Sequence, residues 1–259
     1  MPEKAGQLMV IGNWKMNTNV PEGIKLASKI RELLSGKAYH EIEVVLCPPF
    51  TSIAHISDVL SGSDLKLGAQ NVFYEKEGPF TGEISARMLL GLCQFVIIGH
   101  SERRHVIGES NLDLNAKIKE VFSQDMNPIL CVGETSEERD SGLTNVVVKE
   151  QIRQALDGVE DINGLAIAYE PVWAIGTGVP ASFAQVEDVI ESVIRGELAT
   201  CYDDVISRIT PVLYGGSVSS SNVAEFLGHS SIQGTLLGGA SLDACEFVKI
   251  VDETASHLQ

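Results

Sequence analysis

Residues 8–12 read Leu-Met-Val-Ile-Gly, a short apolar run followed by a segment with helical periodicity. In that segment Pro21 suits a first helical turn, and apolar or small side chains recur on one face at Ile24, Ala27, Ile30 and Leu34. This stretch predicts a β-strand followed by an α-helix.

The same unit recurs along the chain. Further short apolar runs occupy residues 44–47, 65–68, 95–98, 128–132, 165–169, 211–214 and 234–237. Helical periodicity is clear from Asn111 to Phe122 and again in a segment with Val186, Val189, Ile190, Val193 and Ile194. Together with the first run this makes eight candidate strands in 259 residues. The average number of residues per candidate strand is close to the ~30 residues of one βαβ step.

The apolar runs are continuous instead of alternating with polar residues, which indicates strands buried on both faces of a parallel sheet. No linker or composition break divides the chain, and the G-x-G-x-x-G turn of an open dinucleotide-binding sheet is absent after the first run. The sequence therefore predicts an α/β fold in which residues 1–259 form a single (β/α)8 barrel. In such a barrel the chemistry lies at the carboxyl ends of the strands.

The amino-acid composition limits the partners, location and cofactors that we expect for this protein. There are 35 acidic and 19 basic side chains, a net charge of −16, which argues against nucleic acid as a partner. No signal peptide or membrane span is evident, so we expect a cytoplasmic protein without a membrane partner. The five cysteines are scattered without a C-x-x-C pair, and neither a metal nor another cofactor is expected.

Three candidate strands end in residues suited to acid–base chemistry. Asn13 and Lys15 follow the first strand, His100 and Glu102 the fourth, and Glu170 the sixth. Singly, such residues are more often solvated loop positions or a satisfied core histidine. Together they supply a carboxylate base, a hydrogen-bond donor and a fixed positive charge, which suits proton transfer next to a carbonyl.

Local sequence refines these roles. Pro171 keeps Glu170 out of helical geometry. His100 stands where a helical turn begins, and the nearby backbone N–H groups disfavour an added proton, so a neutral donor ring is expected. Glu102 either orients Lys15 or a proton-handling group, or only occupies a helix start.

Two glycine pairs follow the seventh and eighth runs, Gly215-Gly216 before Ser217 and Gly238-Gly239. Glycines let backbone N–H groups approach a ligand, and this is the barrel position where phosphate commonly binds. A single Gly-Gly pair is more often a turn, but two such pairs after neighbouring strands predict an anion site. The apolar loop Val172–Gly178 is either a lid or a permanently packed loop.

Five motifs resemble the triosephosphate isomerase family in order and spacing along the chain: Asn13-Trp14-Lys15-Met16-Asn17, residues 98–104 with His100-Ser101-Glu102, residues 168–178 with Glu170-Pro171-Val172-Trp173, Tyr214-Gly215-Gly216-Ser217-Val218, and Gly238-Gly239-Ala240-Ser241-Leu242. The resemblance implies a TIM barrel that interconverts dihydroxyacetone phosphate and glyceraldehyde 3-phosphate without metal or cofactor.

By the same resemblance Glu170 is the base, His100 the neutral electrophile and Lys15 the electrostatic partner, supported by Asn13 and Glu102. It also implies three further groups. The substrate and phosphate contacts are Asn13, Lys15, Gly176, Ser217, Gly238 and Gly239. The lid is Pro171, Val172, Trp173, Ala174, Ile175, Gly176, Thr177 and Gly178. Its latch residues are Tyr214, Ser217 and Glu134, with Glu134 contacting Trp173 in the open lid.

The family is usually a homodimer in which a loop after the third strand enters the neighbouring active site. The resemblance assigns to that loop Gln70, Phe80, Thr81, Gly82 and Glu83. This chain departs from the family at Pro79, where a small residue is common, and at Val179-Pro180, where Lys-Thr is common. Because proline fixes one backbone dihedral, we expect a stiffer hinge at the end of the lid.

Two other functions are compatible with the same residues. Lys15 is a possible Schiff-base nucleophile, as in barrel aldolases acting on triose phosphates. Alternatively, the barrel binds sugar phosphates without catalysis, although the presence of all the catalytic residue types argues against this.

Overall fold

Parallel strands close into a barrel in the computed structural model, which describes residues 8–37, 39, 41–175, 181–227 and 229–257. Within these residues, eight strands pair in chain order, and β1 also pairs with β8. The strands are β1 (Leu8–Asn13), β2 (Ile42–Cys47), β3 (Lys66–Ala69), β4 (Phe95–Ile98), β5 (Asn127–Val132), β6 (Ala166–Tyr169), β7 (Val212–Tyr214) and β8 (Gly234–Leu237). The predicted α/β barrel is confirmed.

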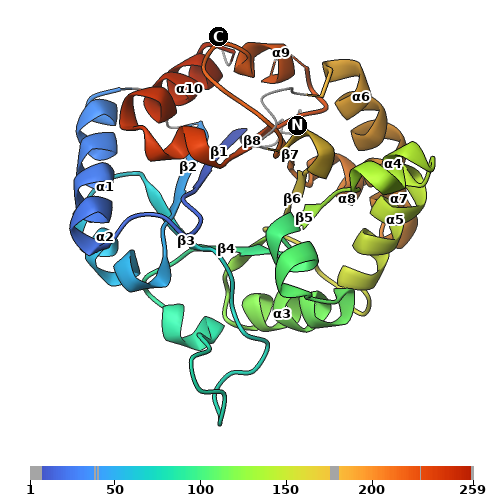
Figure 1. Ribbon diagram of the computed structural model, residues 1–259, viewed down its shortest axis with the longest axis horizontal. Helices are drawn as coiled ribbons and strands as arrows, with labels where there is room; N and C mark the ends of the chain where they lie inside the picture. The colour runs from blue at the N-terminus through green and yellow to red at the C-terminus, as the bar shows by residue number, and fades with distance from the viewer. Residues whose placement is uncertain (1–7, 38, 40, 176–180, 228, 258–259) are drawn as a thin grey trace.

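Helices form a ring outside the strands (Figure 1). The α-helices are α1 (Val20–Leu34), α2 (Ile53–Leu60), α3 (Asn111–Ser123), α4 (Ser136–Asp140), α5 (Thr144–Ala155), α6 (Phe183–Asp188), α7 (Gly196–Cys201), α8 (Asp204–Ile209), α9 (Val223–Leu227) and α10 (Ala244–Ser256). Short 3-10 turns are η1 (Phe50–Ser52), η2 (Ala86–Leu89), η4 (Val172–Ala174) and η6 (Gly239–Leu242), and π-helical turns are η3 (Arg103–Ile107) and η5 (Val189–Arg195).

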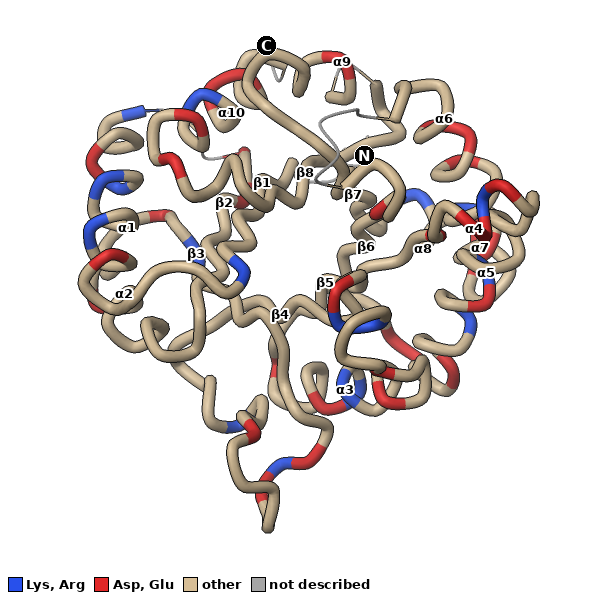
Figure 2. The backbone as a smooth tube through the Cα atoms, in the orientation of Figure 1, with Lys and Arg blue, Asp and Glu red and all other residues tan. Residues whose placement is uncertain are grey.

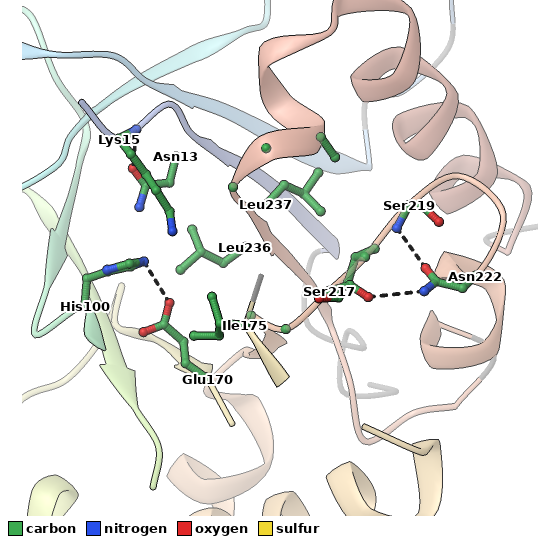
Figure 3. Close-up of a pocket in the computed structure, with 16 residues that line it drawn as sticks. Asn13, Lys15, His100, Glu170, Ile175, Ser217, Ser219, Asn222, Leu236 and Leu237 are labelled. Carbon is green, nitrogen blue, oxygen red and sulfur yellow. Dashed lines mark hydrogen bonds and ion pairs between the residues drawn. The ribbon is translucent and has the colours of Figure 1, made fainter. Parts of the chain in front are cut away.

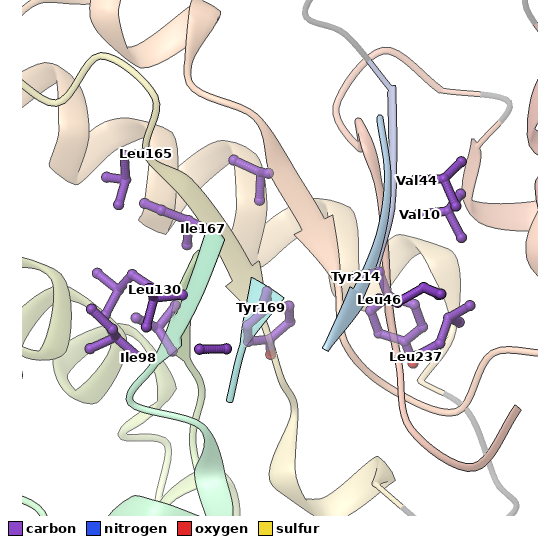
Figure 4. Close-up of a cluster of buried hydrophobic side chains, with 14 of the residues drawn as sticks. Val10, Val44, Leu46, Ile98, Leu130, Leu165, Ile167, Tyr169, Tyr214 and Leu237 are labelled. Atoms are coloured by element: carbon purple, nitrogen blue, oxygen red, sulfur yellow. The ribbon is translucent and has the colours of Figure 1, made fainter. Parts of the chain in front are cut away.

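Two buried clusters explain why the strands are continuously apolar. Alternate residues such as Ile11, Val45 and Ile129 fill the barrel interior. The residues between them face the helices, where Val10, Val44, Leu46, Ile98, Leu130, Ile167 and Leu237 belong to the larger cluster (Figure 4). Both faces of each strand lose water, which is the condition for a parallel sheet.

The first helix begins as its sequence predicts. Asn19 accepts a hydrogen bond from the Glu22 N–H, and the Glu22 carboxylate accepts one from the Asn19 N–H, which forms a capping box around Pro21. Ala27, Ile30 and Leu34 are buried on the face toward the barrel.

One predicted helix is interrupted. The apolar positions from Val186 to Ile194 are all buried, as expected of one amphipathic helix. The backbone instead runs from α6 through the π-helical turn η5 into α7. The π turn ends at Arg195, a buried residue whose guanidinium donates to the carbonyls of Thr210 and Ser231 and to the side chain of Gln233.

The segment between β3 and β4 projects away from the barrel (Figure 1). Acidic residues occur at many positions along the outer helices (Figure 2). Among the described residues, no helix is both long and apolar enough to cross a membrane.

Candidate active site

A cavity of about 370 Å³ opens at the carboxyl ends of the strands. It brings together Asn13 and Lys15 after β1, His100 after β4, Glu170 after β6, and the glycine-containing segments after β7 and β8 (Figure 3). The lining residues are Asn13, Lys15, His100, Glu170, Ile175, Gly215, Gly216, Ser217, Val218, Ser219, Asn222, Leu236, Leu237, Gly238, Gly239 and Ala240. The predicted convergence of these strand ends is thus present.

Glu170 is seated between two glycines. Its N–H donates to the Val132 carbonyl over 2.7 Å, which continues the β5–β6 pairing by one residue. A Cβ on Gly133 would lie 1.8 Å from the Glu170 carbonyl oxygen, and one on Gly215 would lie 2.8 Å from Glu170 Cγ. Neither position has room for a side chain, so Gly215 accommodates Glu170 as well as lining the predicted anion site.

The Glu170 carboxylate faces His100. Glu170 Oε1 lies 3.1 Å from His100 Nε2, and Oε2 accepts a hydrogen bond of 3.0 Å from the Ser101 N–H. The Glu170 and His100 side chains are both nearly inaccessible to solvent. Because little water competes inside the cavity, these contacts are stronger than they would be on the surface.

The other nitrogen of His100 fixes its tautomer. The Glu102 N–H donates to His100 Nδ1 over 3.3 Å, whereas the Glu102 carboxylate is 3.6 Å away, beyond hydrogen-bond distance. Nδ1 therefore acts as an acceptor, and a neutral ring carries its proton on Nε2, which points toward Glu170 and the cavity.

Hydrogen bonds hold both the N–H and the carbonyl group of Lys15. Its φ of 54° lies in the left-handed region, which is strained for a residue with a side chain. The Asn13 Oδ1 accepts a bond from the Lys15 N–H, and Gln70 Nε2 donates to the Lys15 carbonyl over 2.8 Å. At the other end of the side chain, Lys15 Nζ pairs with Glu102 Oε1 at 2.7 Å.

The predicted anion site lies on the wall of the cavity that adjoins Lys15. Ser217, Gly238 and Gly239 line it, and a Cβ on Gly238 would lie 3.2 Å from Lys15 Cε. Of the described residues that line the cavity, Lys15 is the one with a full positive charge. An anion there would depend mainly on backbone N–H groups.

The described part of the predicted lid comprises Pro171, Val172, Trp173, Ala174 and Ile175, with η4 at its centre. The Trp173 Nε1–H donates to Glu134 over 2.9 Å, and the guanidinium of Arg139 lies 4.1 Å from the centre of the Trp173 ring. The predicted residues Gly176, Thr177 and Gly178, and the Val179-Pro180 hinge, fall outside the described residues.

The predicted latch residues surround this segment. The Tyr169 hydroxyl donates to Glu134, and burial, followed by the neighbouring Glu134 charge, raises the pKa of Tyr169 so that its hydroxyl stays protonated. The Ser217 hydroxyl donates to the Ala174 carbonyl over 2.8 Å. On the far side, the Ala181 N–H donates to the Tyr214 hydroxyl, and burial raises the pKa of Tyr214 to about 12.

The predicted dimer residues divide into two groups. Phe80, Thr81, Gly82 and Glu83 are exposed on the projecting segment. Gln70 instead lies at the end of β3, where its amide donates to the carbonyls of Lys15 and Cys47 of the same chain. Gln70 therefore supports the active site directly.

Two further observations concern the buried thiol and possible metal ligands. Burial, and next the Glu170 carboxylate, raise the pKa of the Cys131 thiol well above its ordinary value, so this cysteine is a neutral thiol and a poor nucleophile. Within the described ranges no group of three or more His, Cys, Asp or Glu side chains is arranged to hold a metal ion.

Several supporting residues were not predicted from sequence. Gly133, Asn222 and Ser219 act through backbone contacts, and Gln70 was assigned only to the dimer loop. The position of Gly133 directly after a strand is the one signal that sequence offered; its contact with Glu170 follows from the closed barrel. The others depend on which loops meet across the barrel.

Comparison with known proteins agrees with this geometry. The family model described as triosephosphate isomerase matches residues 8–254. The chain is 47% identical over 244 residues to a triosephosphate isomerase of Pelodictyon phaeoclathratiforme, covering 94% of this chain and 96% of that protein. It is 44% identical over 252 residues to one of Dehalococcoides mccartyi (96% and 97%), and 45% identical over 246 residues to one of Dictyoglomus turgidum (94% and 98%).

Proposed function

The chain belongs to the triosephosphate isomerase family, and we propose that Glu170, His100 and Lys15 carry out its chemistry. It interconverts dihydroxyacetone phosphate and glyceraldehyde 3-phosphate. The 3.1 Å contact between His100 Nε2 and Glu170 Oε1, inside a cavity with a glycine-lined wall, is the observation that supports this assignment most strongly.

The reaction moves one proton between adjacent carbons and another between the oxygens that these carbons carry. The Glu170 carboxylate accepts the proton from the carbon next to the carbonyl, and the C–H electron pair passes to the carbonyl oxygen to form an enediolate. Glu170 then returns the proton to the neighbouring carbon, while the hydroxyl proton on the first carbon passes to the oxygen of the former carbonyl, so that the first carbon becomes the aldehyde. This pairing of a glutamate base with a neutral histidine is the established one for the family.

His100 and Lys15 stabilise the charge that develops on oxygen. His100 offers a proton on Nε2, because Nδ1 is occupied as an acceptor by the Glu102 N–H. Lys15 adds a fixed ammonium charge, and Asn13 and Glu102 hold its backbone and side chain. Substrate must take the place of Glu170 at His100 Nε2, which frees the carboxylate to face carbon.

The remaining residues bind phosphate and exclude water. Asn13, Lys15, Gly176, Ser217, Gly238 and Gly239 contact the substrate and its phosphate, and residues 171–178 close over them. Exclusion of water matters because an enediolate phosphate exposed to solvent could eliminate phosphate before it forms product. The hydroxyls of Tyr214 and Ser217 latch the closed lid, and the Glu134 contact with Trp173 belongs to the open one.

The Schiff-base alternative is not favoured. An amine that attacks a carbonyl must be free to reach it, whereas Lys15 Nζ is engaged in an ion pair with the Glu102 carboxylate at 2.7 Å. Borohydride trapping with substrate should leave Lys15 unmodified. A non-catalytic barrel would show no turnover in a coupled assay.

The test of the base is Glu170→Asp. Shortening the side chain by one methylene withdraws the carboxylate from carbon, so kcat should fall by about 10²-fold or more with a modest change in KM. Steady-state kinetics in a coupled assay would measure this. Near-normal turnover would remove Glu170 from the role of base.

We also propose the domain organisation, the cellular location and the assembly of the enzyme. Residues 1–259 act as one domain in the cytoplasm, where glycolysis takes place. Two copies pair through the exposed residues Phe80, Thr81, Gly82 and Glu83 of the projecting segment. Sedimentation equilibrium of the wild-type chain and of a variant lacking this segment would test the pairing, and a monomeric wild type would contradict it.

A further inference from the structure

The proposed phosphate wall consists of two separate loops. Residues 215–222 follow β7, and residues 238–242 follow β8. Because backbone N–H groups would supply most of the contacts with phosphate, the position of one loop relative to the other determines whether these groups converge on one anion.

The loop after β7 is braced internally by Asn222. The Asn222 amide donates to the Ser217 carbonyl over 3.2 Å and accepts from the Ser219 N–H over 2.8 Å (Figure 3). These bonds fix the curve of the loop. They do not fix its distance from the loop after β8.

Glu246 makes that second connection. Its Oε1 accepts a hydrogen bond of 2.7 Å from the Ser220 N–H, and its Oε2 accepts one of 3.0 Å from the Ser220 hydroxyl. No other hydrogen bond between described residues joins 215–222 to 238–246.

The Glu246 end of this connection is anchored close to the second loop. Glu246 lies in the first turn of α10, which begins shortly after η6. The N-cap Asp243 accepts hydrogen bonds from the N–H groups of Cys245 and Glu246. The carboxylate of Glu246 therefore reaches Ser220 from a backbone that is continuous with Gly238-Gly239.

The charge of Glu246 makes its role testable. A carboxylate near a phosphate dianion opposes its binding, so a purely electrostatic role predicts tighter binding whenever the charge is removed. A geometric role predicts the reverse when the hydrogen bonds are lost. The two effects have opposite signs and can be separated by substitution.

We propose that Glu246 is a positioning residue for the phosphate of the substrate, holding the two loops at the spacing at which their N–H groups meet one anion. This inference rests on the phosphate site assigned under the proposed function. Glu246 acts through Ser220 and the loop backbone, without touching the reacting carbons.

The test compares Glu246→Ala with Glu246→Gln. Glutamine keeps both contacts, since its oxygen accepts from the Ser220 N–H and its amide donates to the Ser220 hydroxyl. For the alanine variant we expect KM for glyceraldehyde 3-phosphate and the inhibition constant of inorganic phosphate to rise about three- to tenfold, with little change in kcat. The glutamine variant should remain within about twofold of wild type or bind phosphate more tightly.

A substrate without phosphate separates positioning from general damage. Turnover of D-glyceraldehyde by Glu246→Ala should match the wild type, because the acid–base groups are unaffected. Ser220→Ala, which keeps the N–H contact, should give a smaller rise in the phosphate inhibition constant. Glu253→Ala removes an exposed carboxylate from the same helix and should change neither constant.

Three results would overturn the inference. The first is an alanine variant with wild-type KM and phosphate inhibition. The second is tighter phosphate binding by both the alanine and glutamine variants, which would assign only an electrostatic role. The third is a parallel loss of D-glyceraldehyde turnover. A wild-type enzyme that inorganic phosphate does not inhibit would instead refute the phosphate site itself.

Discussion

At the scale of single residues, the active site depends on side chains that hold the backbone of others. Lys15 adopts a left-handed φ of 54°, and its peptide groups are bonded on one side by Asn13 and on the other by Gln70. A left-handed conformation costs about 1–2 kcal/mol for a residue with a Cβ, so these contacts must offset that cost. Of these two residues, Asn13 lines the cavity and Gln70 does not.

We expect Gln70→Met to weaken catalysis without removing any charge. The variant keeps a side chain of similar length but removes the Gln70 donor from the Lys15 carbonyl and from the Cys47 carbonyl, which still accepts from the Trp14 N–H. The free energy of unfolding should fall by about 1–3 kcal/mol. Turnover should drop roughly tenfold as the Lys15 ammonium loses its fixed position.

Urea unfolding and steady-state kinetics would measure the two effects separately. Gln94→Met is a suitable comparison, since the Gln94 side chain also bonds to strand backbone, accepting from the Leu67 N–H, but Leu67, unlike Lys15, does not line the cavity. Equal losses of turnover in both variants would show that Gln70 has no particular role in placing Lys15.

At the scale of elements, sequence predicted the strands better than their connections. The strand bounds agree with the apolar runs within about two residues, because burial on both faces leaves a continuous pattern in the sequence. Residues Glu170, His100 and Lys15 could be found because each directly follows such a run or lies within two or three residues of its end.

What sequence did not predict depends on contacts between distant elements. The π turn η5 carries an ordinary helical stripe of apolar residues, and nothing in that stripe marks the change in hydrogen bonding. Gln70 and Glu246 act on Lys15 and Ser220, which are far from them along the chain. Such contacts become visible only once the barrel is closed.

At the scale of the whole molecule, buried thiols and phenols limit stability at high pH. Burial raises the pKa of the Cys93 thiol from 9.0 to about 12 and that of the Tyr214 hydroxyl from 10.0 to about 12. An unfolded chain releases these protons at lower pH than the folded chain. The stabilisation is therefore complete below the unfolded pKa and is lost as the pH rises toward the folded value.

We expect the free energy of unfolding to decrease between about pH 9 and pH 12. Cys93 alone should contribute on the order of 4 kcal/mol to this decrease. Urea unfolding at a series of pH values would measure the slope, and Cys93→Ala should make it shallower. A slope that is the same in wild type and variant would show that Cys93 releases its proton in the folded protein as readily as in the unfolded one.

The central claim, that Glu170 moves the substrate proton, is tested most directly by isotope exchange. Dihydroxyacetone phosphate incubated with the enzyme in D2O should acquire deuterium at the carbon next to its carbonyl, as followed by proton NMR. Glu170→Gln has no base at this position and should lose this exchange by about 10³-fold or more. Exchange by the glutamine variant at the wild-type rate would contradict the account.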